Sequence, residues 1–206
     1  MKRRIYLLGL RHSEYPFVKE EKEALSLSSD KNMLVIDFAR DSKEKIIEKK
    51  KEDIKRFKKL GAKKIEFASD LSDKGIKEKL IQIDLLYIAG GDTELLSKQI
   101  NKKNLTSLIK SFNGIIIGNS AGTYICCKEY VNIKDNNVKI IPALGIVDIC
   151  CKVHYKPEFD SSLLKASKGK KIYAIPDGSV IIVEDGRLSF VKEIYLFENG
   201  KKEKIN

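Results

Sequence analysis

The sequence predicts an α/β protein in which a mostly parallel sheet is covered by helices on both faces. Two observations carry this prediction. Through the first two thirds of the chain, short β-branched runs alternate with amphipathic stretches, a pattern typical of parallel sheets. The last third instead holds short strands separated by turn signals, which predicts antiparallel hairpins added to the edge of the sheet.

The individual elements follow in order along the chain. Strands are expected at RRIYLLGL, NMLVIDFA, KKIEFAS, IDLLYIAGG and GIIIGNS. Helices are expected at PFVKEEKEALSL, residues 42–60, DKGIKEKLIQ, DTELLSKQINK, LTSLIKSF and AGTYICCKEY. The turn signals of the last third are Pro176–Asp177–Gly178, Asp185–Gly186 and Asn199–Gly200. No repeat or linker interrupts the pattern, so residues 1–206 are predicted to form a single domain.

Length and composition predict a cytoplasmic protein. The 206 residues are 42% hydrophobic, and the apolar runs are too short to cross a membrane. The opening MKRRIYLLGLRHSE has too short an apolar stretch for a secretory signal and is interpreted as the first strand.

The net charge of +11 raises the question of nucleic-acid binding. Most of the lysines alternate with glutamates, as in the stretch 42–60. There, Gly61 ends the helix, and the expected buried face consists of Ile46, Ile47, Ile54, Phe57 and Leu60. The lysines then form a solvated outer surface, and no nucleic-acid partner is expected.

The four cysteines form two adjacent pairs, Cys126–Cys127 and Cys150–Cys151. Their spacing does not match a zinc site, and neighbouring cysteines rarely form a disulfide with each other. Reduced thiols in buried elements are therefore expected, with no metal and no cofactor.

The stretch GIIIGNSAGTYICC fits the pattern G-x-S-x-G, with Gly118, Ser120 and Gly122. In a nucleophile elbow, a serine occupies a tight turn between a strand and a helix, and small neighbours make room for it. The alternative is an ordinary strand–turn–helix junction in which Ser120 caps the helix.

A serine nucleophile needs a base, and the chain holds two histidines, His12 and His154. His154 is favoured because it lies downstream of Ser120, as in chains with the order Ser…Asp…His. The acid that orients the histidine stays open at this point. The candidates are Asp135, Asp148, Glu158 and Asp160.

Four segments in this order resemble peptidase E, the aspartyl dipeptidase family, and its relative cyanophycinase. They are YIAGGDTELL, GIIIGNSAGTYICC, ALGIVDICCKVHYKPEFD and IYAIPDGSVIIVEDG, and they span roughly residues 80–186. The resemblance implies a fold like that of class I glutamine amidotransferases, with serine in place of their cysteine. It also implies Ser120 as nucleophile, His154 as base and Asp135 as the acidic member.

The resemblance further implies an oxyanion hole formed by Gly91 and the backbone N–H of Ala121. The neighbouring Gly90, Asp92 and Asn119 are expected to bind substrate. Asp92 stands where the family commonly has asparagine. The family's substrate-binding arginine is also missing after His154, where Lys156, Lys165 and Lys168 are the available cations.

The sequence thus predicts a serine peptidase that hydrolyses dipeptides or short peptides through an acyl-enzyme, including those with an N-terminal aspartate. Its partner would be a small peptide substrate, and it would be a monomer or homodimer without membrane attachment. The alternatives are an amidase or esterase on the same site and a catalytically silent domain that binds a ligand.

Overall fold

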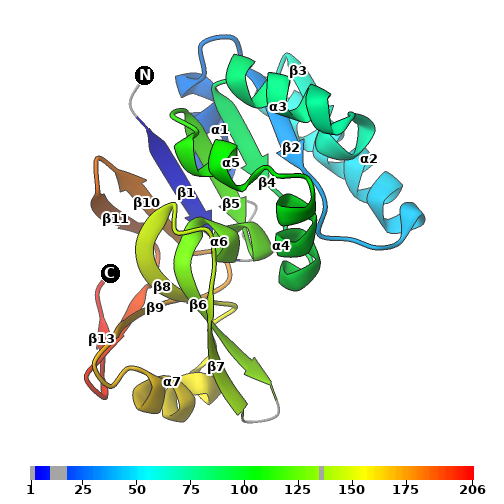
Figure 1. Ribbon diagram of the computed structural model, residues 1–206. Helices are drawn as coiled ribbons and strands as arrows, with labels where there is room; N and C mark the ends of the chain where they lie inside the picture. Colours follow the sequence, from blue (N-terminus) through cyan, green and yellow to red (C-terminus); the bar gives the residue numbers. More distant parts are fainter. Residues whose placement is uncertain (1–2, 10–17, 135–136) are drawn as a thin grey trace.

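The computed structural model describes residues 3–9, 18–134 and 137–206, and contains two β-sheets with helices packed around the first (Figure 1). The strands of the first sheet are β1 (Arg4–Leu8), β2 (Asn32–Ile36), β3 (Lys64–Phe67), β4 (Leu85–Ile88), β5 (Ile115–Asn119), β10 (Val180–Glu184) and β11 (Arg187–Val191). Those of the second are β6 (Cys127–Lys134), β7 (Asn137–Pro142), β8 (Val147–Val153), β9 (Lys171–Ile175), β12 (Tyr195–Glu198) and β13 (Lys201–Lys204).

Helices connect most of the strands of the first sheet. They are α1 (Val18–Leu27), α2 (Lys43–Leu60), α3 (Asp73–Gln82), α4 (Thr93–Lys102), α5 (Thr106–Ser111), α6 (Ala121–Cys126) and α7 (Asp160–Ala166), with single turns η1 (Ala68–Asp70) and η2 (Pro157–Phe159). α7 is the exception, because it packs against the second sheet.

The first sheet confirms the predicted α/β class. Its order is β11-β10-β1-β5-β4-β2-β3, and the five strands from β1 to β3 in that order are parallel. Alternate residues of each strand enter different core clusters: Ile5 and Leu7 pack with α3 to α6, whereas Tyr6 and Leu8 pack with α1 and α2. Helices therefore cover both faces (Figure 1).

The C-terminal hairpins are distributed differently from the prediction. Only β10 and β11 extend the edge of the first sheet, next to β1. The other late strands join a second sheet of order β13-β12-β9-β8-β6-β7. Its central pairs, β6 with β8 and β8 with β9, are parallel.

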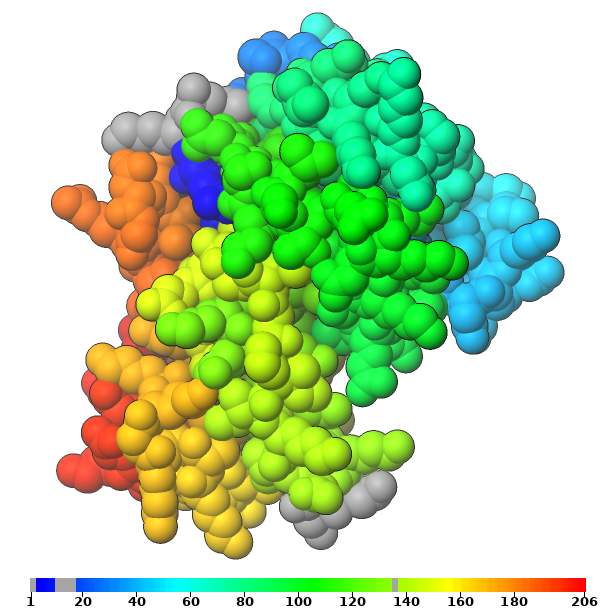
Figure 2. Space-filling view, viewed as in Figure 1, coloured from blue at the N-terminus to red at the C-terminus, as the bar shows by residue number. Residues whose placement is uncertain are grey.

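The predicted helix AGTYICCKEY is confirmed in its first part and wrong in its last four residues. α6 ends at Cys126, and β6 begins at Cys127 and pairs with both β7 and β8. These partners satisfy the backbone groups of residues 127–134 in strand form, so tertiary pairing outweighs the short helical pattern. Figure 2 shows the green region of α4 and α5 next to the yellow-green region of β6 to β8 on one surface.

The lysine-rich helix α2 has the expected ends but a different buried face. The Ser42 side chain caps its first turn, and Gly61 ends it in a left-handed conformation with φ of 104°. Of the expected face, only Phe57 is fully buried, whereas Ile47 and Ile54 are exposed. Two charged side chains of the helix are buried beside Phe57, because Arg56 pairs with Asp53 and with a glutamate of α1.

All four cysteines are free thiols and buried, as predicted. The sulfur atoms of Cys127 and Cys151 lie 3.2 Å apart on β6 and β8. Burial raises the pKa of both Cys126 and Cys150 to about 12, so these thiols are neutral at physiological pH. Over the described part of the chain, no helix combines the length and apolar character needed to cross a membrane.

Candidate active site

Ser120 occupies a strained turn between β5 and α6. Its backbone has φ of 52° and ψ of −106°, a conformation that L-residues rarely adopt and that costs about 1–3 kcal/mol. Its amide donates to the carbonyls of Leu8 and Gly9 at the end of β1, which holds the turn in place. This is the geometry of a serine presented at the carboxyl end of a parallel sheet.

The two flanking glycines are required by close backbone packing. A Cβ on Gly122 would lie 2.0 Å from the carbonyl oxygen of Ile88 on the neighbouring strand. A Cβ on Gly118 would lie 2.8 Å from the carbonyl oxygen of Gly122. The G-x-S-x-G pattern therefore reflects an α6 that starts directly against β4 and β5, with no room for a side chain at position 118 or 122.

Ser120, His154 and Asp177 form a continuous hydrogen-bonded chain. Ser120 Oγ lies 2.7 Å from His154 Nε2, and His154 Nδ1 lies 2.8 Å from Asp177 Oδ1. An ionised carboxylate only accepts, so Nδ1 carries the hydrogen and Nε2 is left to accept from the serine hydroxyl. That tautomer is the one in which the imidazole can take a proton from Ser120.

The second sheet brings the histidine and the aspartate together. β8 and β9 are parallel neighbours, with Val153 opposite Ile175. His154 directly follows β8 with φ of 55°, and Asp177 follows β9 in the turn that leads into β10. Both side chains are about one-third exposed, at 34% each, so the chain is open to solvent and to substrate.

The end of β1 couples this turn to the serine. The amide of Gly9 donates to the carbonyl of Ser179 while the carbonyl of Gly9 accepts from the amide of Ser120. A Cβ on Gly9 would lie 2.4 Å from the carbonyl oxygen of Pro176. Gly9 therefore lets the serine turn and the aspartate turn approach from the two sheets.

Of the acids considered from the sequence, the three that the structure describes do not occupy the third position. Asp135, the acid implied by the resemblance, lies outside the described residues, as does His12. Asp148 pairs with a lysine of β6 at the start of β8, and its side chain is 83% exposed. Asp160 accepts from the hydroxyl of Tyr155, and Glu158 is exposed on η2.

Asp177 was missed as a candidate because IYAIPDG reads as a strand followed by a turn. The available signal was its position at the carboxyl end of a strand, where sites of parallel sheets collect. That signal needs the strand order, since only the pairing of β9 with β8 puts this strand end beside His154.

The two residues expected to form an oxyanion hole lie at neighbouring strand ends. Ala121 is the first residue of α6, where an N–H has no acceptor within the helix. Gly91 follows β4 with φ of 145°, and a Cβ there would lie 2.3 Å from the carbonyl oxygen of Ala39. Among the described residues, neither N–H has a hydrogen-bond acceptor.

The three residues expected to bind substrate differ in their surroundings. The Asp92 carboxylate caps α4 by accepting from the amide of Leu95 at 2.8 Å, so its charge serves the helix. Asn119 is buried, and its Oδ1 has no partner among the described residues. A Cβ on Gly90 would lie 3.0 Å from the Asn119 amide nitrogen, which places Gly90 beside the elbow.

In the described residues, no group of three or more His, Cys, Asp and Glu side chains is placed to hold a metal ion. The hydrogen-bonded chain of hydroxyl, imidazole and carboxylate instead has the parts for acyl transfer by a serine nucleophile.

Comparison with known proteins identifies the family of this chain. The family model for peptidase family S51 matches residues 11–191. A peptidase from an acI-B1 actinobacterium has a similar fold, with a TM-score of 0.74, 15% identity, and coverage of 100% of this chain and 95% of that chain. A putative peptidase E from Listeria monocytogenes EGD-e has a TM-score of 0.67, 19% identity, and coverage of 93% and 98%.

A comparison with curated protein sequences finds no match. The family model nevertheless covers most of the sequence and includes Ser120, His154 and Asp177. The chain belongs to peptidase family S51 and is a serine-type peptidase.

Proposed function

We propose that this peptidase hydrolyses dipeptides or short peptides through an acyl-enzyme formed on Ser120. The observation that carries the proposal is the pair of hydrogen bonds that joins Ser120 to His154 and His154 to Asp177. The open, one-third exposed histidine and aspartate suit a small substrate that reaches the serine from the solvent side.

In the first half of the reaction, Ser120 Oγ attacks the scissile carbonyl carbon while His154 Nε2 takes the hydroxyl proton. The imidazolium that forms is stabilised by the Asp177 carboxylate at Nδ1. When the carbon–nitrogen bond breaks, His154 returns the proton to the leaving amine. Water then attacks the ester with His154 again as base, which releases the acid product and restores Ser120.

The backbone amides of Ala121 and Gly91 are the proposed donors to the oxyanion. Ala121 directly follows the nucleophile, and Gly91 lies on the adjacent strand end, so a carbonyl attacked by Ser120 can approach both. Donors of this kind act on charge that appears only in the transition state, and losing one typically lowers the rate about 10²–10³-fold.

Replacement of the nucleophile tests this proposal. Ser120→Ala should abolish turnover of a panel of short peptides and aminoacyl anilides, and should abolish labelling by a fluorophosphonate probe. Ser111→Ala, which changes an exposed serine of α5, is the matched control. Retained peptidase activity in folded Ser120→Ala protein would refute the assignment, and a panel that includes esters separates a peptidase from an esterase.

We also propose that Lys152 gives the site a preference for an N-terminal aspartate. The lysines considered from the sequence, Lys156, Lys165 and Lys168, are all exposed. Lys152, two residues before His154, is only 8% exposed. Burial lowers the pKa of Lys152, and the charge of Asp177 opposes that shift.

Lys152 has few partners for a buried cation. Its Nζ lies 3.4 Å from the hydroxyl of Tyr124 and 4.7 Å from the ring centre of Phe159, and among the described residues no carboxylate pairs with it. A buried ammonium without a counter-ion is costly unless a ligand supplies one. The acidic side chain of the substrate is the proposed counter-ion.

The ratio of kcat/KM for aspartyl and leucyl anilides measures this preference. Lys152→Met should lower the ratio at least tenfold and leave leucyl turnover within a few-fold of the wild type. Lys156→Met is the matched control and should leave the ratio unchanged. An unchanged ratio in Lys152→Met would refute the role of Lys152 without touching the assignment of Ser120.

A further inference from the structure

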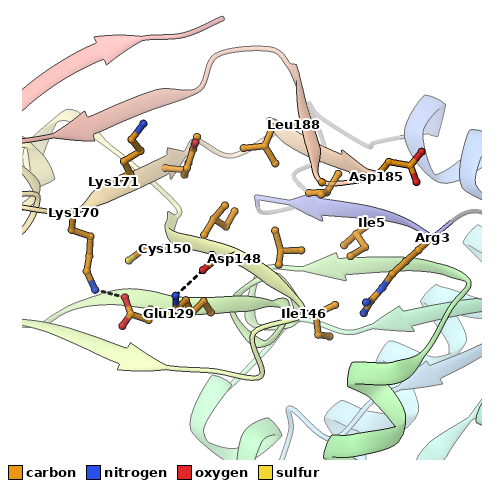
Figure 3. A pocket seen from close by; sticks show the side chains of 16 residues that line it. Arg3, Ile5, Glu129, Ile146, Asp148, Cys150, Lys170, Lys171, Asp185 and Leu188 are labelled. Carbon is orange, nitrogen blue, oxygen red and sulfur yellow. Dashed lines mark hydrogen bonds and ion pairs between the residues drawn. The ribbon is translucent and has the colours of Figure 1, made fainter.

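A second cavity lies between the two sheets, at the end opposite the proposed active site (Figure 3). It has a volume of about 640 Å³ and is lined by residues from the amino ends of β1, β6, β8 and β9 together with β10 and β11. Ser120, His154 and Asp177 instead follow the carboxyl ends of β5, β8 and β9. The strands separate the two sites, so the cavity is not part of the peptide site.

The apolar part of the cavity wall comes from both sheets. Ile5, Val183 and Leu188 form a cross-strand row on β1, β10 and β11, because Ile5 pairs with Val183 and Val183 with Leu188. Ile146 and Ile149 line the facing wall (Figure 3). All five belong to, or pack against, the core cluster that joins the sheets. A cavity of this size that combines an apolar wall with charged groups is suited to a small organic ligand.

The charged side chains around the cavity are mostly paired. Lys128 binds Asp148 at 2.8 Å, and Lys170 forms an ion pair with Glu129. Figure 3 draws both pairs along one side of the cavity. In these two ion pairs each lysine is neutralised by a carboxylate, so the pairs add no net charge to this side of the cavity.

Arg3 is the exception among the lining cations. Among the described residues it has no carboxylate partner, and its only hydrogen bond runs from one terminal nitrogen to the carbonyl of Lys110 at 3.0 Å. Its Nε is buried and has no acceptor. Burial also lowers the pKa of the guanidinium, as expected for a cation that has lost part of its hydration. Arg3 lies at the opposite end of the cavity from Lys170 and Lys171 (Figure 3).

We propose that this cavity binds a small organic acid with an apolar body, with its carboxylate on Arg3 and its body against Ile5, Val183 and Leu188. The arginine has unused donors in a fork that matches the two oxygens of a carboxylate. The apolar row begins at Ile5, two residues after Arg3, and Arg3 directly precedes β1. Asp185 lines the same end of the cavity as Arg3 (Figure 3), and the free donors of the arginine beside the apolar row favour an amphiphilic monoanion over a cationic ligand.

Octanoate is the probe that tests this inference. Its binding to the full-length protein is measured by calorimetry and by amide chemical shifts, beside octylamine and octan-1-ol, which carry the same chain with a positive charge or none. Octanoate should bind, with shifts at the cavity residues, and both other ligands should bind at least tenfold more weakly. Arg3→Met should weaken octanoate binding by about tenfold or more, because a charge-assisted contact is lost. Arg3→Lys keeps the positive charge but lacks the two-pronged guanidinium, so its affinity for octanoate should lie between those of the wild type and Arg3→Met.

Arg187→Met is the matched control, since Arg187 is an exposed arginine on β11 that does not line the cavity. It should bind octanoate like the wild type. Ser120→Ala should also bind it unchanged, and a dipeptide should not displace it. The inference is overturned if octanoate does not bind at millimolar concentration, if octan-1-ol binds as well, if Arg3→Met has no effect, or if a dipeptide competes. None of these results depends on whether the protein turns over peptides.

Discussion

Replacing Asp177 with asparagine tests the part of the active site that the sequence did not predict. The substitution keeps the size of the side chain and removes the charge that faces His154 Nδ1. During acylation the imidazole becomes positively charged, and in the variant that charge has no carboxylate beside it. The amide can also donate to Nδ1, which would place the imidazole in the tautomer that cannot accept from Ser120.

The magnitude follows from the contact distance and the exposure of the pair. Two opposite unit charges 2.8 Å apart attract by about 6 kcal/mol at an effective dielectric constant of 20, and by about 1.5 kcal/mol in bulk water. Because both side chains are 34% exposed, a value near 3 kcal/mol is expected, which corresponds to about 10²-fold in kcat. A population of the wrong tautomer increases the loss, up to the roughly 10⁴-fold effect known for the equivalent change in a serine protease.

The assay is the initial rate of anilide hydrolysis for wild type, Asp177→Asn, Asp148→Asn and Asp135→Asn at equal concentrations of folded protein. Asp148→Asn is the matched control, because its carboxylate is 83% exposed and pairs with Lys128. It should retain wild-type kcat. A kcat of Asp177→Asn within threefold of the wild type would refute the reasoning, and a large loss in Asp135→Asn alone would assign the acid to Asp135.

Three further predictions concern stability. Gly122→Ala should lower the free energy of unfolding by about 1–3 kcal/mol, since its Cβ would meet the carbonyl oxygen of Ile88 at 2.0 Å. Gly75 lies within α3, where a Cβ would be 3.4 Å from a serine hydroxyl, so Gly75→Ala should instead raise the free energy of unfolding by about 0.5–1 kcal/mol. Urea titration measures both variants, and equal effects would contradict the packing argument. Arg56→Met should cost about 3–5 kcal/mol, because two carboxylates that are each 1% exposed lose their guanidinium; a loss below 1 kcal/mol would show that the cluster is hydrated. Burial lowers the pKa of Lys152 in the folded protein below its usual 10.5. At a pH between the lowered pKa and 10.5, the unfolded chain therefore holds a proton that the folded protein has released. The free energy of unfolding of the wild type should therefore rise with pH in that window. Lys152→Met should lack this rise and should be more stable than the wild type at pH 7. Identical pH profiles of stability for the two proteins would refute a buried, unpaired ammonium at Lys152.

Much of the first sheet and the serine turn could be predicted because their signals are local. Each parallel strand of that sheet is a short apolar run, and a helix follows it along the chain. The elbow is equally local, since a β-branched strand, Ser120 and its two glycines lie within nine residues. His154 could be proposed as the base because it is one of two histidines and lies downstream of Ser120.

The second sheet could not be predicted in the same way. Residues 121–130 read as one helix, yet α6 ends after six residues and the rest becomes β6. The deciding contacts are the hydrogen bonds to β7 and β8, which are supplied by residues further along the chain. The buried face of α2 was mispredicted for a similar reason, because the ion pair of Arg56 with a glutamate of α1 sets which side faces inward.

By itself, then, the sequence determined the alternation of strands and helices and predicted the proposed nucleophile, because each depends on residue types within a short window. Only the tertiary structure decided which carboxylate completes the chain and where unpaired cations remain. Asp177 is 23 residues from His154, and they meet because β9 lies parallel to β8. Lys152 and Arg3 stand out only when their surroundings are known, since a lysine or arginine in a sequence does not show whether a carboxylate lies beside it. Contacts across strands and between sheets leave no periodic mark in the chain, which is why the acid of the site and both proposed anion contacts come from the fold.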